Sequence, residues 1–156
     1  MREVLFRGKD KETGEWRFGY YAVDGDKHYI LVWAGLRSIC HERSGCFTAE
    51  YFEVIPETVG QYTGLPDKNG VKIFESDVVK KWICGEGLSN YFVHYVNCGF
   101  RLKPIRQDMT ASEIEEQFGD GFLLQPLGDL SIDYEVIGNI HDDPELLEAI
   151  DEPKES

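Results

Sequence analysis

Basic and aromatic side chains are interleaved between residues 80 and 106. The set comprises Lys80, Lys81, Trp82, Tyr91, Tyr95, Phe100, Arg101, Lys103 and Arg106. Lysine and arginine neutralise phosphates while aromatic rings stack on bases, and together these groups form platforms for single-stranded nucleic acid. The alternative is a solvated pair of strands whose rings belong to the core. The candidate binding surface consists of Lys80, Lys81, Trp82, Tyr95, Arg101 and Lys103.

Cysteine and histidine residues form one set that could be considered for a metal. Its members are Cys40, His41, Cys46, Cys84, His94 and Cys98. None of the cysteines forms the Cys-x-x-Cys pair that closed zinc sites usually contain. His94 and Cys98 are four residues apart on a predicted strand and turn, a separation of about 13 Å unless the chain folds sharply at residues 97–99. We therefore predict free thiols that pack as small hydrophobic side chains, and no metal site.

Sequence motifs that anchor common catalytic sites are missing. The chain has no Gly-x-x-x-x-Gly-Lys-Ser/Thr or Gly-x-Gly-x-x-Gly loop for phosphates. It also lacks a Gly-x-Ser-x-Gly elbow and a His-Glu-x-x-His helix. The acidic pair Asp142-Asp143 precedes Pro144 and fits the start of a helix. We predict a protein without enzymatic activity and without a cofactor.

The net charge of −13 is concentrated in the last third of the chain. Residues 1–107 contain 15 Lys/Arg and 14 Asp/Glu, whereas residues 108–156 contain one Lys and 15 Asp/Glu. This segment is either a solvated acidic surface or a face for a basic partner, and it would repel phosphates. Because the basic strands and the acidic segment are complementary, they also favour a self-complementary homo-oligomer.

The length and composition of the chain indicate a folded protein. A chain of 156 residues suits one domain or two small subdomains, and 42% hydrophobic residues exclude general disorder. No segment has the roughly 18 consecutive apolar residues that a membrane span requires. Residues 1–10 lack the apolar region of a secretory signal. We predict a cytoplasmic protein without membrane contacts.

Short β-strands separated by glycine-rich turns are predicted over most of the chain. Their ranges are 2–8, 16–23, 28–33, 47–55, 59–63, 71–74, 78–84, 91–96, 100–104, 122–125 and 134–140. Residues 110–113 form a Thr-x-x-Glu capping box that predicts a helix at 111–118, and Pro144 predicts a second helix at 144–150. The expected fold is mainly β, with a meander at 1–60, a second subdomain at 61–150 and a tail at 151–156.

Turn chemistry explains the polar residues between 64 and 77. Asn69-Gly70 tolerates positive φ at both central positions of a turn. Asp77 can accept backbone N–H groups as an Asx turn. Gly64 and Glu75 complete a loop that could bind a ligand, but turn geometry accounts for all of these residues. We interpret this loop as structural.

Three blocks of the sequence, at 6–16, 57–80 and 134–147, form one recognisable pattern. The central block contains E-T-V-G-Q-Y-T-G-L, D-K-N-G and I-F-E-S-D-V-V-K. The pattern resembles the YopX family of phage and prophage proteins, with 6–16 similar to the family's start and 134–147 to its end. The resemblance implies that the later subdomain is an SH3-like barrel and that the protein acts in a bacterial host cell. No activity is assigned to the family, so no functional residue can be transferred. Ser76 replaces a usual glycine, which implies strain or a different turn if this position has positive φ.

Together these observations predict a non-enzymatic phage or prophage accessory protein. We expect a β-rich interaction module that forms a homo-oligomer or contacts a host or phage protein. The alternative is a nucleic-acid-associated protein that binds through the basic aromatic strands.

Overall fold

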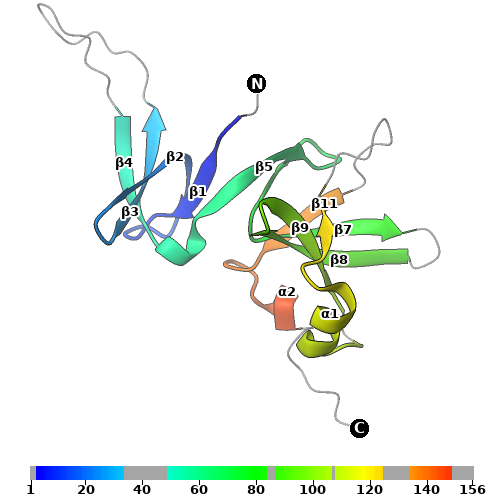
Figure 1. Cartoon of the computed structure of the whole chain (residues 1–156). Coiled ribbons are helices and arrows are strands. Elements are labelled where there is room, and N and C mark those ends of the chain that lie inside the picture. The colour runs from blue at the N-terminus through cyan, green and yellow to red at the C-terminus, as the bar shows by residue number, and fades with distance from the viewer. Residues whose placement is uncertain (1–2, 34–48, 84–86, 107, 125–133, 149–156) are drawn as a thin grey trace, which may run out of the picture. The chain divides into compact units, whose positions relative to one another are not determined.

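The computed structural model describes residues 3–33, 49–83, 87–106, 108–124 and 134–148 (Figure 1). The chain divides into two units, unit 1 at residues 1–62 and unit 2 at residues 63–156. Nearly all described secondary structure consists of antiparallel strands, and the described part of the chain also contains two short α-helices. The predicted fold class, mainly β with two short helices, is confirmed. None of the described helices is long and apolar enough to cross a membrane.

Unit 1 is built from consecutive antiparallel strands, as the predicted meander requires. Its elements are β1 (Phe6–Lys9), β2 (Trp16–Asp24), β3 (Lys27–Trp33), β4 (Ala49–Val54), a 3-10 turn at Pro56–Thr58 and the start of β5 (Gly60–Pro66). The strands lie in the order β4-β3-β2-β1-β5, and β6 of unit 2 pairs with the far end of β5. β2 pairs with β1 through residues 16–19 and with β3 through residues 20–24.

The two faces of the sheet in unit 1 differ in burial. Ile30 and Val54 are buried on one face, where the absent side chain of Gly8 leaves room for Val54. The end of β1 curls toward the end of β4, because Asp10 and Val54 form a bridge and the Ile55 N–H donates to the Lys9 carbonyl at 2.9 Å. Side chains alternate along a strand, so the neighbours of these buried residues point to the other face.

Unit 2 is organised around a five-stranded sheet. Its further elements are β6 (Lys72–Phe74), β7 (Asp77–Ile83), β8 (Gly87–Val96), β9 (Gly99–Ile105), α1 (Ala111–Phe118), β10 (Phe122–Leu123), β11 (Tyr134–Asn139) and α2 (Glu145–Glu148). The strands of this sheet lie in the order β10-β9-β8-β7-β11. Its inner face carries a core formed by Ile73, Val79, Tyr91, Val93, Phe100, Leu102, Leu124 and Tyr134. β8 starts earlier than predicted, because the polar Ser89 and Asn90 pair with β7.

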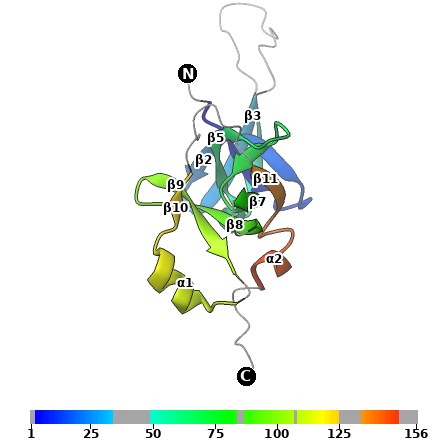
Figure 2. The ribbon, with the colours of Figure 1, turned by 90° about the vertical axis from the view of Figure 1, so that its right-hand side faces the viewer.

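Both helices of unit 2 lie on the same side of this sheet (Figure 1, Figure 2). α1 begins with the predicted capping box, in which Thr110 and Glu113 each bind the other's backbone N–H. Ile114 is fully buried as α1 packs against β9. α2 is described only to residue 148, so the end of the predicted helix and the tail at 151–156 lie outside the described residues.

The SH3-like barrel implied by the family resemblance is not closed. β10 and β11 occupy opposite edges of the five-stranded sheet, and no described strand pair joins them. β10 contains only two residues, Phe122 and Leu123, and both pair with β9. So short a strand offers few further ladder hydrogen bonds, and the sheet remains open.

The turn at residues 67–70 differs from the prediction. Gly70 has a φ of 83°, whereas Asn69 does not have a positive φ, so only one position is left-handed. The Asx turn forms at Asp67, whose Oδ1 accepts the Asn69 N–H at 2.8 Å. Asp77 also accepts a backbone N–H, that of Phe74 three residues before it, at 2.8 Å. The expectation of a positive φ at Asn69 was therefore wrong.

Candidate functional site

The predicted binding surface is divided between two faces of the sheet in unit 2. The strand register places Lys80, Arg101 and Lys103 on the face that carries the helices. Lys81 and Tyr95 belong to the opposite face, the one that also bears the core. Trp82 lies in β7, but its side chain is outside the described part of the structure. These residues do not form one continuous surface.

Several of the basic side chains already bind groups of their own unit. Lys103 forms a salt bridge with Glu115 of α1. Arg101 Nη1 donates to the Gly121 carbonyl at 3.4 Å. Lys81 Nζ lies 3.4 Å from the Tyr134 hydroxyl and 4.9 Å from the centre of its ring. Phosphates would have to compete with these internal partners.

Lys80 lines a pocket of about 490 Å³ on the helix-bearing face of unit 2. The other lining residues are Leu88, Ser89, Asn90, Ile105, Arg106, Asp108, Glu145 and Leu146. Two cations and two carboxylates therefore surround this space, and neither sign of charge is in excess. The pocket gives no preference for a phosphate.

The cysteine and histidine residues are only partly described. Cys40, His41, Cys46 and Cys84 lie outside the described residues. The chain does fold sharply after β8, with Asn97 and Cys98 at φ 48° and 61°. Cys98 is exposed in this turn, and His94 Nε2 lies 2.9 Å from the Asp120 carbonyl oxygen. Among the described residues, no three His, Cys, Asp or Glu side chains are placed to hold a metal ion.

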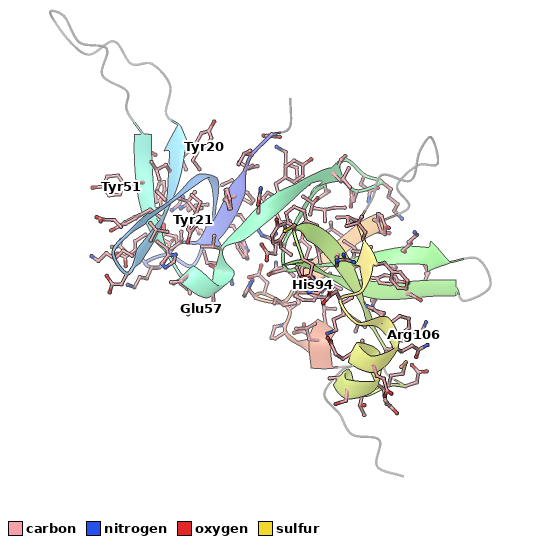
Figure 3. All side chains as sticks on the ribbon, in the orientation of Figure 1. Tyr20, Tyr21, Tyr51, Glu57, His94 and Arg106 are labelled. Carbon is pink, nitrogen blue, oxygen red and sulfur yellow. The ribbon has the colours of Figure 1, made fainter. Side chains whose placement is uncertain are left out.

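An aromatic face on unit 1 is the most distinctive exposed surface among the described residues. The register aligns Tyr20 of β2, Leu31 of β3 and Tyr51 of β4 in one row. Phe18 lies two residues before Tyr20, and Phe18, Tyr20 and Tyr51 are 47%, 60% and 73% exposed. Figure 3 shows Tyr20 and Tyr51 projecting outward from unit 1. We call Phe18, Tyr20, Tyr29, Leu31 and Tyr51 the aromatic face.

A pocket of about 460 Å³ adjoins the aromatic face at the strand pair β3–β4. We call it the tyrosine pocket, and it is lined by Asp10, Lys11, Glu12, Tyr29, Tyr51, Phe52 and Glu53. The rings of Tyr29 and Tyr51 are 6.0 Å apart between centroids and meet at 80°. Tyr29 is directly opposite Glu53 in the ladder.

Charged groups around the tyrosine pocket are fixed by short contacts. Lys11 Nζ lies 2.6 Å from Glu53 Oε1, and this hydrogen bond lowers the pKa of Glu53 and raises the pKa of Lys11. Asp10 accepts the Glu12 N–H at 2.9 Å and lies 3.0 Å from an Arg17 nitrogen. The Glu12 N–H and Arg17 hold the pKa of Asp10 below its usual value against the effect of burial. Both carboxylates are therefore ionised at neutral pH.

Sequence reasoning missed the aromatic face and the tyrosine pocket. The period-two spacing of Phe18 with Tyr20, and of Tyr29 with Leu31, was a usable signal for one shared face on each strand. The approach of Tyr29 to Tyr51 depends on the β3–β4 register, which no local pattern specified.

The chain belongs to the YopX family, whose model, described as YopX protein, matches residues 5–148. This match confirms the family resemblance of the sequence. Among solved structures, the chain is similar to protein EF1440 from Enterococcus faecalis, with 22% identity and a TM-score of 0.49. That alignment covers 94% of this chain and 99% of the other. No curated protein gives a significant match.

Proposed function

We propose that this member of the YopX family is a non-enzymatic interaction module that associates through the aromatic face of unit 1. The observation that carries the proposal is the exposure of Phe18, Tyr20 and Tyr51 on one face of a sheet. Aromatic residues, tyrosine among them, are enriched at protein interfaces and provide large contact areas at low conformational cost. Grouped exposed apolar side chains commonly mark contact sites.

The roles of the ionisable groups support a non-enzymatic function. Catalytic sites commonly contain groups whose pKa values are shifted in a cleft. Here the lowered pKa of Asp67 has a structural cause, because three backbone N–H groups bind its carboxylate. The lowered pKa of Asp10 likewise comes from the turn at Glu12 and from Arg17.

A second copy of the chain is the partner that we propose. An aromatic face can meet the same face of another copy about a two-fold axis, because such an interface is self-complementary. Pairing between the basic strands and the acidic last third has less support, since Lys103 and Lys81 already bind Glu115 and Tyr134 within their own unit. We therefore expect the aromatic face to form the contact, rather than pairing of the basic strands with the acidic last third.

The biological setting is part of the same proposal. The family resemblance supports an accessory role in phage or prophage, in the cytoplasm of a bacterial host. Nucleic-acid binding is the second candidate, and its basic residues lie on two faces of the sheet. The placement of these residues favours the self-association proposal.

The salt dependence of self-association tests the proposal. We expect light scattering to detect a dimer of the full chain that persists at high salt, because salt screens charge pairs but does not weaken apolar burial. The double variant Tyr20→Ser with Phe18→Ser should weaken the dimer by at least about tenfold, since two interface aromatics are lost. Tyr95→Ser on unit 2 is the control, because Tyr95 is also exposed. A monomer at all salt and protein concentrations would refute self-association.

Binding to a labelled single-stranded DNA at low salt tests the second candidate. The self-association proposal expects no binding. Binding that is lost in the double variant Lys80→Glu with Lys81→Glu would instead support the nucleic-acid function.

A further inference from the structure

We propose that the tyrosine pocket of unit 1 binds a lysine or arginine side chain of a partner protein. The inference rests on the proposed function and deepens it, because it assigns the chemistry of one contact at the part of the aromatic face formed by Tyr29 and Tyr51. It rests on the shape of the pocket, on its aromatic walls and on an ammonium group that the chain itself places there.

The two tyrosine rings form a corner suited to a cation. Tyr29 and Tyr51 meet nearly edge to face, with 6.0 Å between ring centroids, so their planes are approximately perpendicular. Aromatic faces attract cations, and perpendicular rings around an ammonium group are the arrangement of aromatic cages. Tyr51 is 73% exposed, so a side chain can approach the corner from solvent.

Unit 1 already places cations on aromatic rings, and one of these rings lines this pocket. The Arg17 guanidinium lies 4.1 Å from the ring centre of Phe52, one of the lining residues. The guanidinium of Arg7 lies 4.6 Å from the ring of Trp16 on β2. A cation in the tyrosine corner would repeat an interaction that unit 1 already makes on the rings of Phe52 and Trp16.

The charges around the pocket select a cation over an anion. Its lining contains three carboxylates, of Asp10, Glu12 and Glu53, and a single ammonium group, that of Lys11. Arg17 does not line the pocket but forms a salt bridge with Asp10. The net charge around the pocket is negative even when Arg17 is counted. A phosphate or a carboxylate would meet repulsion from these groups, and a neutral ligand would gain nothing from them.

The ammonium group of Lys11 already lies at the pocket, where it is bound to Glu53. Its Nζ contacts Glu53 Oε1 at 2.6 Å, and the side chains of Lys11 and Glu53 are 61% and 29% exposed. Exposed ion pairs of this kind contribute little stability, so another cation can replace Lys11 at Glu53 at low cost. An incoming ammonium or guanidinium would then contact Glu53 and the rings of Tyr29 and Tyr51.

The test is an NMR titration of the full chain with lysine amide, arginine amide and norleucine amide, each acetylated at its α-amino group so that only the side chain can carry a cation. Norleucine amide keeps the alkyl chain but lacks the side-chain cation. We expect saturable shifts of the Tyr29, Tyr51 and Glu53 amide signals with both cationic probes, and at least about fivefold weaker binding of norleucine amide. Equal shifts with norleucine amide, or shifts confined to other residues, would overturn the proposal.

Substitutions in the pocket distinguish the contributions of the Tyr51 ring, the Tyr51 hydroxyl and the competing Lys11 ammonium group to cation binding. Tyr51→Ala should weaken binding of the cationic probes by about two- to fivefold, whereas Tyr51→Phe should retain it because the ring remains. Lys11→Ala should tighten binding by roughly two- to fivefold, because the internal competitor is removed. Weaker binding by Lys11→Ala, or unchanged binding by Tyr51→Ala, would overturn the assignment.

Two further arms distinguish the ligand source and the role of self-association. Choline tests a free quaternary ammonium compound, and binding of choline more tightly than either amide would overturn the assignment to a protein side chain. Tyr20→Ala is the matched control, because Tyr20 is an exposed tyrosine of the same face that does not line the pocket. At a protein concentration where the chain is monomeric, Tyr20→Ala should leave the cation titration unchanged. At higher concentration it should weaken self-association, so failure of one proposal can be told from failure of the other.

Discussion

The carboxylate of Asp67 accepts the backbone N–H of Val136 at 3.0 Å, although the two residues are 69 positions apart in the chain. Its other oxygen accepts the N–H groups of Asn69 at 2.8 Å and Val71 at 2.9 Å. One side chain therefore closes the turn after β5 and attaches β11 to it. Asp67 is 5% exposed, so these bonds are shielded from water.

Replacement of Asp67 should destabilise unit 2. Asp67→Asn loses the charge and one acceptor, and we expect the free energy of unfolding to fall by about 1–3 kcal/mol. Asp67→Ala leaves three N–H groups without this acceptor and should cost more, about 3 kcal/mol or above. Urea unfolding measures the change, with the exposed Glu116→Gln of α1 as the control. A cost for Asp67→Ala no larger than that of the control would contradict the role of Asp67.

The pKa of Asp67 predicts how stability depends on pH. Burial by itself raises this pKa, but the N–H groups of Val136, Val71 and Asn69 hold it below the usual 3.8. A pKa lowered by folding contributes stability above the unfolded pKa, and this contribution is lost as pH falls through the folded pKa. Wild-type stability should therefore fall from pH 4 downward more steeply than that of Asp67→Asn.

Urea midpoints of both proteins, measured between about pH 7 and pH 3, test this difference. Asp67→Asn should keep part of the acid sensitivity, because the pKa values of Asp10 and Glu53 are lowered as well. Parallel curves for wild type and Asp67→Asn would show that Asp67 does not titrate as proposed.

Local sequence signals predicted the elements well where one residue type determines the backbone. The Thr110–Glu113 capping box defined the start of α1, and period-two alternation defined most strands. The Asp67–Val136 bond could not be predicted, because it joins segments that only the tertiary fold brings together. Local reasoning therefore considered an Asx turn at Asp77 and none at Asp67.

The candidate surface is divided between two faces of the sheet for a reason that the sequence already contained. Lys80 and Lys81 are adjacent in a strand, so their side chains must point to opposite faces. The pairing of Lys103 with Glu115 depends on how α1 packs on β9, which composition does not specify. The prediction grouped residues by chemical type along the chain, whereas the side chains of a binding surface on a sheet must point to the same face.

Ser76 is strained by its backbone conformation. Its φ is 71°, in the region that glycine occupies without a steric penalty. The conformation is held by the Ser76 N–H to Val93 carbonyl bond at 2.8 Å and by the Ile140 N–H to Ser76 carbonyl bond at 3.1 Å. These bonds fix β7, β8 and β11 around the turn.

Ser76→Gly should raise the free energy of unfolding by about 0.5–1 kcal/mol. The substitution removes the backbone strain, and part of this gain is offset because glycine increases the conformational entropy of the unfolded chain. Urea unfolding measures the gain. Ser89→Gly is the matched control, because Ser89 lies within β8 at a position without positive φ, where glycine should be destabilising. A loss of stability in both variants would mean that Ser76 is not strained.

The hairpin between β8 and β9 contains a second strained position. Asn97 and Cys98 have φ values of 48° and 61°, so both central residues of this two-residue turn are left-handed. Such turns favour Asn-Gly, and Cys98 occupies the position that glycine would fill. Cys98 is exposed, so its side chain contributes little packing.

Cys98→Gly should therefore stabilise the chain by about 1 kcal/mol. Cys98→Ala separates the two effects of the substitution, because it removes the thiol but keeps the Cβ atom that causes the strain, and it should change stability little. Both variants can be compared with wild type by urea unfolding under reducing conditions, so that thiol oxidation does not contribute. Equal gains in Cys98→Gly and Cys98→Ala would assign the effect to the thiol and contradict backbone strain at this turn.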